Sequence, residues 1–279
     1  MRATGLLMLV GSCFLAASAL GQGNGAIFGC AGTDKVLVGV QGKAGAWIDG
    51  MYPLCIGLKD DGSWIGVPLS LIHVGGYGGI GSHTFELTCP TNFAVGGVSG
   101  TRGSYVNQIK LICKPLTTGG HLGGGSQGEG PWGGDPGPSA YGPLGCSPAD
   151  APARDILLHA ATWIDSIDQL SCGYPPTYSL ANFTTATTLV VGGNRISITV
   201  TLNKAAEVIG GVPITITSSV PSAIASQSVT IAIDRTSQTF FVPTNGVGVS
   251  TSVQLTARFG SKSLPATVTL IPPLIRPSR

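Results

Sequence analysis

Short runs in which apolar and polar residues alternate recur along the C-terminal half of the chain, between glycine, proline, asparagine and serine residues. Alternation with a period of two is typical of a half-buried β-strand, and several short strands at this spacing indicate a β-sandwich. The region has the size of one such domain, so we expect a single sandwich over residues 178–273. The predicted strands are 195–202, 212–217, 229–233, 239–242, 253–259 and 266–271.

The N-terminal half carries a unit that is repeated three times and marked by cysteines. The units are bracketed by Cys30 and Cys55, Cys89 and Cys113, and Cys146 and Cys172, at separations of 25, 24 and 26 positions. The first two units share x-G-V-x-G preceded by Leu or Val, a further glycine, an aromatic residue, a β-branched residue and Asp or Asn. The third unit keeps only the end of this pattern, Trp163-Ile164-Asp165. The triplication indicates three copies of one β-hairpin with a glycine-rich turn.

An even number of cysteines in an exported chain indicates disulfides. A hairpin brings its second cysteine back beside its first, so the spacing favours bridges within the units. Bridges between cysteines of different units are the alternative that the sequence leaves open. Glycine-rich segments at 75–79 and 119–134 separate the hairpins. We expect them to be surface loops within the module, the first leading into a strand at His83–Thr88.

The start of the chain and its composition indicate export. Residues 1–21 combine a positive start, an apolar run and small residues at its end, which predicts a cleaved signal peptide. Cys13 leaves a lipoprotein as an alternative. Charged residues make up only 10% of the 279, without the Lys/Arg cluster that nucleic acid or an anionic membrane surface would require. We expect a secreted protein, on an outer surface or in a periplasm, with no nucleic-acid partner, no membrane insertion and a short tail at 274–279.

Two family resemblances refine the fold. The run Gly-Lys-Ala-Gly-Ala-Trp-Ile-Asp at 42–49 resembles the G-x-x-G-x-x-[β-branched or Leu]-D run of jacalin-related lectins, and Gly-Pro-Trp-Gly-Gly at 130–134 resembles their N-terminal glycine-rich segment. The triplicated hairpin with its disulfides is similar to the outer-layer protein of the egg vitelline membrane. Both families share the β-prism, three sheets around a pseudo-threefold axis, which the resemblance implies for residues 22–174. Val-Gly-Gly-Asn at 191–194 and the strand at 199–204 resemble bacterial immunoglobulin-like repeats, which implies an immunoglobulin-like sandwich that serves as a spacer or adhesive stalk.

The resemblance to jacalin-related lectins also implies sugar-binding positions. In that family the glycine offers a backbone N–H, the Asp accepts sugar hydroxyls and a neighbouring aromatic packs against the sugar. The matching residues are Gly45, Trp47 and Asp49 in the first unit, Gly103, Tyr105 and Asn107 in the second, and Trp163 and Asp165 in the third. An amide at 107 lacks the charge-assisted bonds of a carboxylate, which weakens the second site. Ala161 replaces the glycine of the third.

A structural role for these positions is the competing interpretation. A short carboxylate or amide beside a turn can satisfy the backbone N–H groups of that turn, and would then recur in every repeat. Alternation along 105–113 places Asn107 on the same side as Ile109 and Leu111, which favours this interpretation for the second unit.

Nothing in the sequence indicates an enzyme. The four histidines have no metal-like spacing, neither G-x-S-x-G nor H-E-x-x-H occurs, and bridged cysteines leave no thiol nucleophile. Asp60-Asp61-Gly62 predicts a hairpin turn rather than a calcium site. We therefore expect no catalysis, no metal and no cofactor. The sequence predicts a secreted carbohydrate-binding protein whose partners are glycans or cell-surface polysaccharide. The alternative is a structural envelope or matrix protein with no sugar site.

Overall fold

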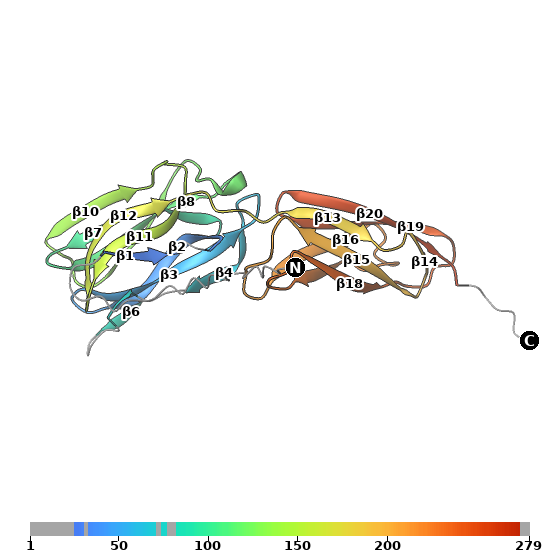
Figure 1. The fold of residues 1–279 in the computed structure, drawn as a ribbon, viewed down its shortest axis with the longest axis horizontal. Helices are drawn as coiled ribbons and strands as arrows, with labels where there is room; N and C mark the ends of the chain where they lie inside the picture. The colour runs from blue at the N-terminus through green and yellow to red at the C-terminus, as the bar shows by residue number, and fades with distance from the viewer. Residues whose placement is uncertain (1–24, 31–32, 71–73, 77–81, 274–279) are drawn as a thin grey trace, which may run out of the picture.

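The chain forms two all-β modules that lie end to end (Figure 1). The structure is a computed structural model, and it describes residues 25–30, 33–70, 74–76 and 82–273. The predicted signal peptide, Cys13 and the tail at 274–279 lie outside the described residues. Within them the elements are strands, apart from one 3₁₀ turn, η1 (Thr118–Gly120). Strands β1 to β12 build the first module and β13 to β20 the second.

The first module contains three separate sheets, each centred on one of the predicted hairpins. The strand order is β4-β3-β2-β6 in the first sheet, with the short β5 also pairing β3, β10-β7-β8-β9 in the second and β1-β11-β12 in the third. The strands are β1 (Gly25–Gly29), β2 (Lys35–Ala44), β3 (Ile48–Leu58), β4 (Trp64–Ser70), β5 (Val74–Gly75), β6 (His83–Thr88), β7 (Phe93–Arg102), β8 (Val106–Pro115), β9 (Gln127–Gly133), β10 (Ser139–Gly145), β11 (Ala153–Ala160) and β12 (Ile164–Cys172).

The three sheets are joined in a cycle by the strands that precede each unit. β6 runs into Cys89 of the second unit but pairs with β2 of the first, and β10 runs into Cys146 of the third unit but pairs with β7 of the second. β1 runs into Cys30 of the first unit and pairs with β11 of the third. The strand that precedes each unit therefore pairs in the sheet of the unit before it. β1, which precedes the first unit, pairs in the third sheet and so completes the cycle.

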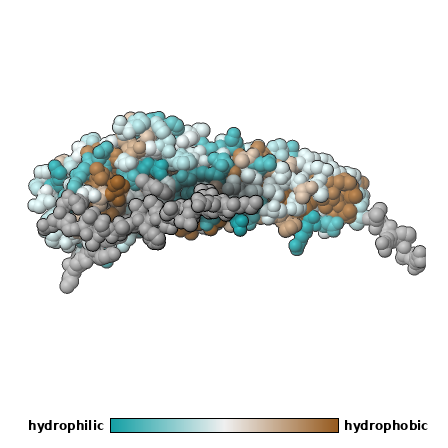
Figure 2. Space-filling model, in the orientation of Figure 1, coloured by the Kyte–Doolittle hydropathy of each residue, from teal (hydrophilic) through white to brown (hydrophobic). Residues whose placement is uncertain are grey.

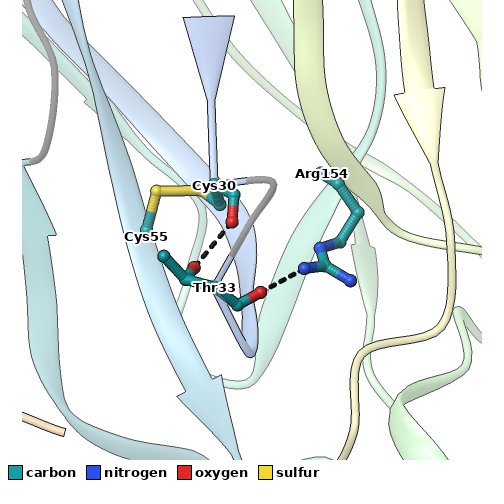
Figure 3. The surroundings of a disulfide bond; sticks show 4 residues. All are labelled: Cys30, Thr33, Cys55 and Arg154. Atoms are coloured by element: carbon teal, nitrogen blue, oxygen red, sulfur yellow. Dashed lines mark hydrogen bonds between the residues drawn. A yellow bond between two sulfur atoms is a disulfide. The ribbon is translucent and has the colours of Figure 1, made fainter. Parts of the chain in front are cut away.

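The three disulfides confirm the pairing within units. Cys30–Cys55, Cys89–Cys113 and Cys146–Cys172 have Cα–Cα distances of 5.8, 5.6 and 5.6 Å, in the ordinary range for a bridge. Around the first bridge, the Thr33 hydroxyl donates to the Cys30 carbonyl, and the Arg154 guanidinium donates to the Thr33 carbonyl (Figure 3). Arg154 belongs to the third unit, so this contact also ties the two ends of the cycle together.

Two glycine-rich stretches that we expected to be loops are partly strands. Residues of the 119–134 segment form β9, which pairs with β8, and Val74–Gly75 forms β5, which pairs with β3. The prediction of loops was wrong at these positions. A glycine-rich segment has little intrinsic preference for a strand, but here it lies beside an open sheet edge whose backbone groups it pairs.

The core of the first module lies where the three sheets meet. Phe28, Leu37, Ile109 and Ile156 come from four strands of the three sheets and are fully buried in one apolar cluster. A second cluster, which includes Val36, packs on the other side of the first sheet. The β2–β3 hairpin is therefore covered on both faces along much of its length.

The second module is a sandwich of two sheets with an immunoglobulin-like strand order. A sheet of order β13-β15-β18 packs over one of order β14-β20-β19-β16-β17, which corresponds to strands A, B and E facing A′, G, F, C and C′. The strands are β13 (Leu180–Thr185), β14 (Leu189–Val191), β15 (Arg195–Leu202), β16 (Val212–Ser218), β17 (Gln227–Ile231), β18 (Ser237–Pro243), β19 (Thr251–Phe259) and β20 (Lys262–Ile271). Figure 2 shows apolar surface at the end of this module farthest from the first.

Tyr178 anchors the junction between the modules. Its side chain is 1% exposed, its N–H donates to the Leu58 carbonyl at 2.8 Å, and its carbonyl accepts from the Asp60 N–H at 2.9 Å. The Lys204 ammonium lies 3.8 Å from the centre of the Tyr178 ring and 2.6 Å from Asp34 Oδ2. Apolar, cation–π and charge-paired contacts thus join the modules at one place.

Candidate functional site

The three aromatic residues predicted from the repeat meet in one cluster, which we call the aromatic tip (Trp47, Tyr105 and Trp163). Their ring centroids lie 5.2 Å apart for Trp47 and Tyr105, 5.6 Å for Trp47 and Trp163, and 4.9 Å for Tyr105 and Trp163. Each pair meets edge-on or at a tilt, as aromatic pairs prefer. Three positions expected to serve separate sites therefore form one surface.

The tip is built from the same local geometry three times. Within each hairpin turn, the N–H of Gly45, Gly103 or Ala161 donates to the carbonyl of the aromatic residue two positions later, at 3.0 Å each time. Ala161 makes the same bond as the two glycines, so its Cβ does not disturb the turn. The aromatic side chains consequently emerge at equivalent positions in all three units.

Asp49, Asn107 and Asp165 are β-bulge residues. The register shifts by one residue where β3 passes Asp49, where β8 passes Asn107 and where β12 passes Asp165. A bulge leaves its extra residue out of the ladder and redirects its side chain. The recurring Asp or Asn of the sequence repeat thus marks a β-bulge at the same place in all three hairpins.

The three bulge residues differ in exposure. Asp49 is 7% exposed and accepts a hydrogen bond from the Ser82 hydroxyl at 2.8 Å. Asn107 is 6% exposed, and its amide donates to the Ala46 carbonyl at 3.0 Å. Asp165 is half-buried. The first two side chains contact the protein, but they bond to Ser82 and Ala46 rather than to the N–H groups of their own turns. Of the three, Asp165 retains the most contact with solvent.

Asn107 also carries a buried acceptor, Oδ1, that has no hydrogen-bond partner among the described residues. Its neighbourhood is narrow, because a Cβ at Gly137 would lie 2.6 Å from that oxygen. Amide oxygens of this kind are normally paired with protein or ordered water. Asn107 Oδ1 is therefore a hydrogen-bond acceptor at the position where the lectin resemblance predicts one, and it lies next to the Gly137 backbone.

Two glycine pairs, Gly75–Gly76 and Gly133–Gly134, cover the first two bulges. Gly76 N–H donates to the Asp49 carbonyl at 2.7 Å, and Gly134 N–H donates to the Asn107 carbonyl at 2.6 Å. Gly75 and Gly133 have positive φ values, 89° and 132°. The two glycine pairs therefore make the same contact with the backbone of the bulge in both units.

The aromatic tip lies at the end of the first module that faces away from the second. Lys35, at the start of β2, donates from its ammonium to the Glu207 carbonyl of the second module. The ten residues of β2 then run to Ala44 and the turn that carries Trp47, a distance of about 33 Å for an extended strand. All three rings are half-buried, so each keeps part of its surface open to solvent.

Trp132 is an exposed aromatic that the sequence analysis did not single out as a site residue. It lies on β9 opposite Ile109 and is 55% exposed. Strand alternation would not have revealed this exposure, because its partner Ile109 is fully buried and paired residues share a face of the sheet. A tryptophan this exposed, one residue before a glycine pair, is a second candidate contact surface.

The residues that the structure describes contain no group of three or more His, Cys, Asp or Glu side chains arranged to hold a metal ion. No helix among them is long and apolar enough to span a bilayer. The Asp60-Asp61-Gly62 segment forms the turn between β3 and β4, in which Asp61 accepts from the Ser63 N–H at 2.9 Å.

Comparison with known proteins adds little to this geometry. No protein-family model and no curated protein matches the sequence. The D0-D1 domain of Intimin is 11% identical, with 84% of this chain and 100% of that chain covered and a TM-score of 0.28. The D00-D0 domain of Intimin is 13% identical, with 83% and 99% covered and a TM-score of 0.28. Scores this low carry no argument, so the immunoglobulin-like order of the second module rests on its own strand pairing.

Proposed function

We propose that the protein is an exported, non-catalytic carbohydrate-binding protein that contacts its ligand through the aromatic tip. The observation that carries the proposal is the convergence of Trp47, Tyr105 and Trp163 on one partly open surface. Aromatic rings offer flat apolar faces against which the C–H groups of a sugar pack, and the polar edges of Trp and Tyr stay compatible with water. The half-buried Asp165 adds a carboxylate that accepts hydroxyl protons in charge-assisted hydrogen bonds.

The rest of the molecule supports this assignment. Three disulfides indicate folding in an oxidising compartment outside the cytoplasm, where glycans are displayed. The cycle of three sheets supports the β-prism that the lectin resemblance implies. The second module then acts as a spacer, joined to the first module at the end opposite the aromatic tip.

A structural role without sugar binding is the second candidate, and one observation favours it. Asp49 and Asn107 are buried and hydrogen-bonded to the protein, so the polar groups of the first two units are committed to the fold. In that case the aromatic tip only closes the end of the core. The two candidates differ in what they predict for variants of the rings.

Binding of the mature chain to a glycan array tests the proposal, with Trp163→Ala as the main variant. We expect binding to at least one glycan class and a loss of about tenfold or more in Trp163→Ala, because stacking contacts of this size are removed. Phe241→Ala is the matched control, since Phe241 is 70% exposed but belongs to the second module. Thermal denaturation of each variant checks that the fold is retained.

A more conservative variant separates binding from folding. Asp165→Asn keeps the shape of the side chain but removes its charge, and we expect weaker binding at unchanged thermal stability. Absence of binding to any glycan, or equal binding by Trp163→Ala and the parent chain, would contradict the proposal and favour the structural role.

A further inference from the structure

Among the described residues the third sheet has three strands, against four in the second sheet and five in the first, and the unfilled position is at the outer edge of β12. In the first sheet β3 is flanked on its outer edge by β4 and β5, and in the second sheet β8 is flanked by β9. After β12 the chain does not turn back, because it runs to Tyr178, which pairs with Lys59 at the junction. The link to the second module thus takes the place of a returning strand.

We propose that the outer edge of β12 binds an extended strand of another protein, and that this strand carries two consecutive glycines. The strand would complete the third sheet by β-augmentation, with main-chain hydrogen bonds supplying affinity and side-chain size supplying selectivity. The inference does not require sugar binding by the aromatic tip, but the incoming strand would cover Asp165, which the proposed sugar contact also uses.

The two completed sheets define what the edge of β12 requires. In the first, Gly75 lies opposite Gly50 and Val74 opposite Met51. In the second, Gly133 lies opposite Gln108 and Trp132 opposite Ile109. Counting from the bulge residues, the equivalent positions on β12 are Ser166 and Ile167. An incoming strand would therefore place its first glycine beside Ser166 and a larger side chain beside Ile167.

Both glycines of the incoming strand are required for steric reasons. A Cβ at Gly75 or Gly133 would lie less than 3.0 Å from the carbonyl oxygen of the bulge residue. A Cβ at Gly76 or Gly134 would lie less than 3.0 Å from a carbonyl oxygen in the turn of the neighbouring unit, Thr162 or Ala46. In the third sheet the same neighbours are Asp165 and, in the turn of the second unit, Ser104.

The exposure of Asp165 is consistent with an unfilled position. The equivalent residues Asp49 and Asn107, in the two sheets that have a glycine pair, are buried, whereas Asp165 is only half-buried. The Asp168 carboxylate lies 3.1 Å from His159 Nε2 on β11 and accepts from the Ser166 hydroxyl at 2.7 Å. Asp165 is therefore the carboxylate that favours a partner strand with lysine or arginine beside the glycines. Pairing of β12 with β12 of a second copy does not fit, because the strand contains no glycine and would bring these acidic residues together.

The probe is a synthetic peptide, acetyl-Lys-Val-Trp-Gly-Gly-Lys-amide, titrated into the ¹⁵N-labelled full chain. We expect saturable changes in the NMR amide signals of Ser166, Ile167 and Ser104. Replacing the second glycine by N-methylglycine removes the N–H equivalent to those of Gly76 and Gly134, and we expect about tenfold weaker binding from the loss of this bond. An Ala-Ala peptide of otherwise identical sequence should not bind.

Hydrogen exchange of the chain alone provides a second readout. We expect the edge amides of β12 to exchange faster than the equivalent amides of β3 and β8, because no strand protects them. Equal binding of the Ala-Ala peptide, or no change at Ser166 and Ile167 at millimolar peptide, would overturn the proposal. Protection of the β12 edge amides without peptide would also overturn it. Protection that is independent of protein concentration would mean that the chain's own residues fill the edge, and protection that rises with concentration would mean that a second copy does.

Discussion

Burial is nearly continuous along the central hairpin of the first module, whereas it alternates strictly in the second. All ten residues of β2 except Gln41 and Lys43 are buried, while in β15 every second residue is. β2 lies between two apolar clusters, and β15 has a core on one face and solvent on the other. The difference shows why alternation identified the second module, while cysteine spacing and glycine pattern were needed to identify the first.

The modules also differ in what stabilises them. The first divides its apolar residues among three small sheets and carries all three disulfides. The second has no cysteine and depends on one continuous core. All four tryptophans belong to the first module, so tryptophan fluorescence follows its unfolding alone, and circular dichroism follows both.

Removing one disulfide should have the largest effect. For Cys89→Ser combined with Cys113→Ser, we expect the first module to lose about 2–5 kcal/mol of its free energy of unfolding, because the unfolded chain regains its freedom. Denaturation followed by tryptophan fluorescence measures this loss. A similar shift in the transition of the second module, seen by circular dichroism, would show that the modules do not differ in this way.

Alkaline pH should weaken each module through one tyrosine. Burial raises the pKa of Tyr178 from 10.0 to about 12, and burial likewise raises the pKa of Tyr141 in the first module. The folded chain holds these protons more tightly than the unfolded chain, so the associated stability is complete below pH 10. It is lost above pH 10, and for Tyr178 the loss is complete as pH rises through 12. For Tyr178 the loss is about 2–3 kcal/mol at most.

The matched variants are Tyr178→Phe and Tyr141→Phe, compared in denaturation between pH 9 and 12. Each variant should remove part of the loss of stability at alkaline pH. The effect of Tyr141→Phe should appear in the fluorescence transition, and that of Tyr178→Phe in the transition followed by circular dichroism. A pH dependence that neither variant changes would contradict the assignment to these two side chains.

A small change in the core of the second module should act only there. Ile214 is fully buried in the sandwich. We expect Ile214→Val to cost about 1 kcal/mol, from the lost methylene group and the space it leaves. Circular dichroism should show the shift while the fluorescence transition stays in place. A shift in both would mean that the two cores unfold as one unit.

The smallest effect should come from the polar contacts across the junction. The Asp60 carboxylate accepts from the Ser261 N–H at 3.0 Å and from its hydroxyl at 2.5 Å. Because these bonds are near solvent, we expect Asp60→Ala to cost about 0.5–1 kcal/mol and to separate the two unfolding transitions further. Asp61→Ala, whose carboxylate bonds only within its own turn, is the control. Equal effects of the two variants would leave Asp60 without a special role between the modules.

Local pattern was sufficient for many of the elements. The predicted strands at 195–202 and 83–88 coincide with β15 and β6, and the three cysteine pairs form as their spacing indicated. These features depend on neighbouring residues, whose alternation or turn chemistry acts over a few positions. The glycine-rich β9 was missed because its pairing with β8 depends on an edge outside the segment itself.

The sequence by itself determined the two-part β organisation, the hairpin repeat and the residues that make the aromatic tip. Trp47, Tyr105 and Trp163 could be chosen from the repeat, but their meeting within 6 Å could not, since about 58 positions separate each from the next. Only the tertiary structure decided that Asp49 and Asn107 are buried while Asp165 keeps contact with solvent. These outcomes depend on how sheets distant in sequence close into a cycle, and on which strand the link to the second module replaces.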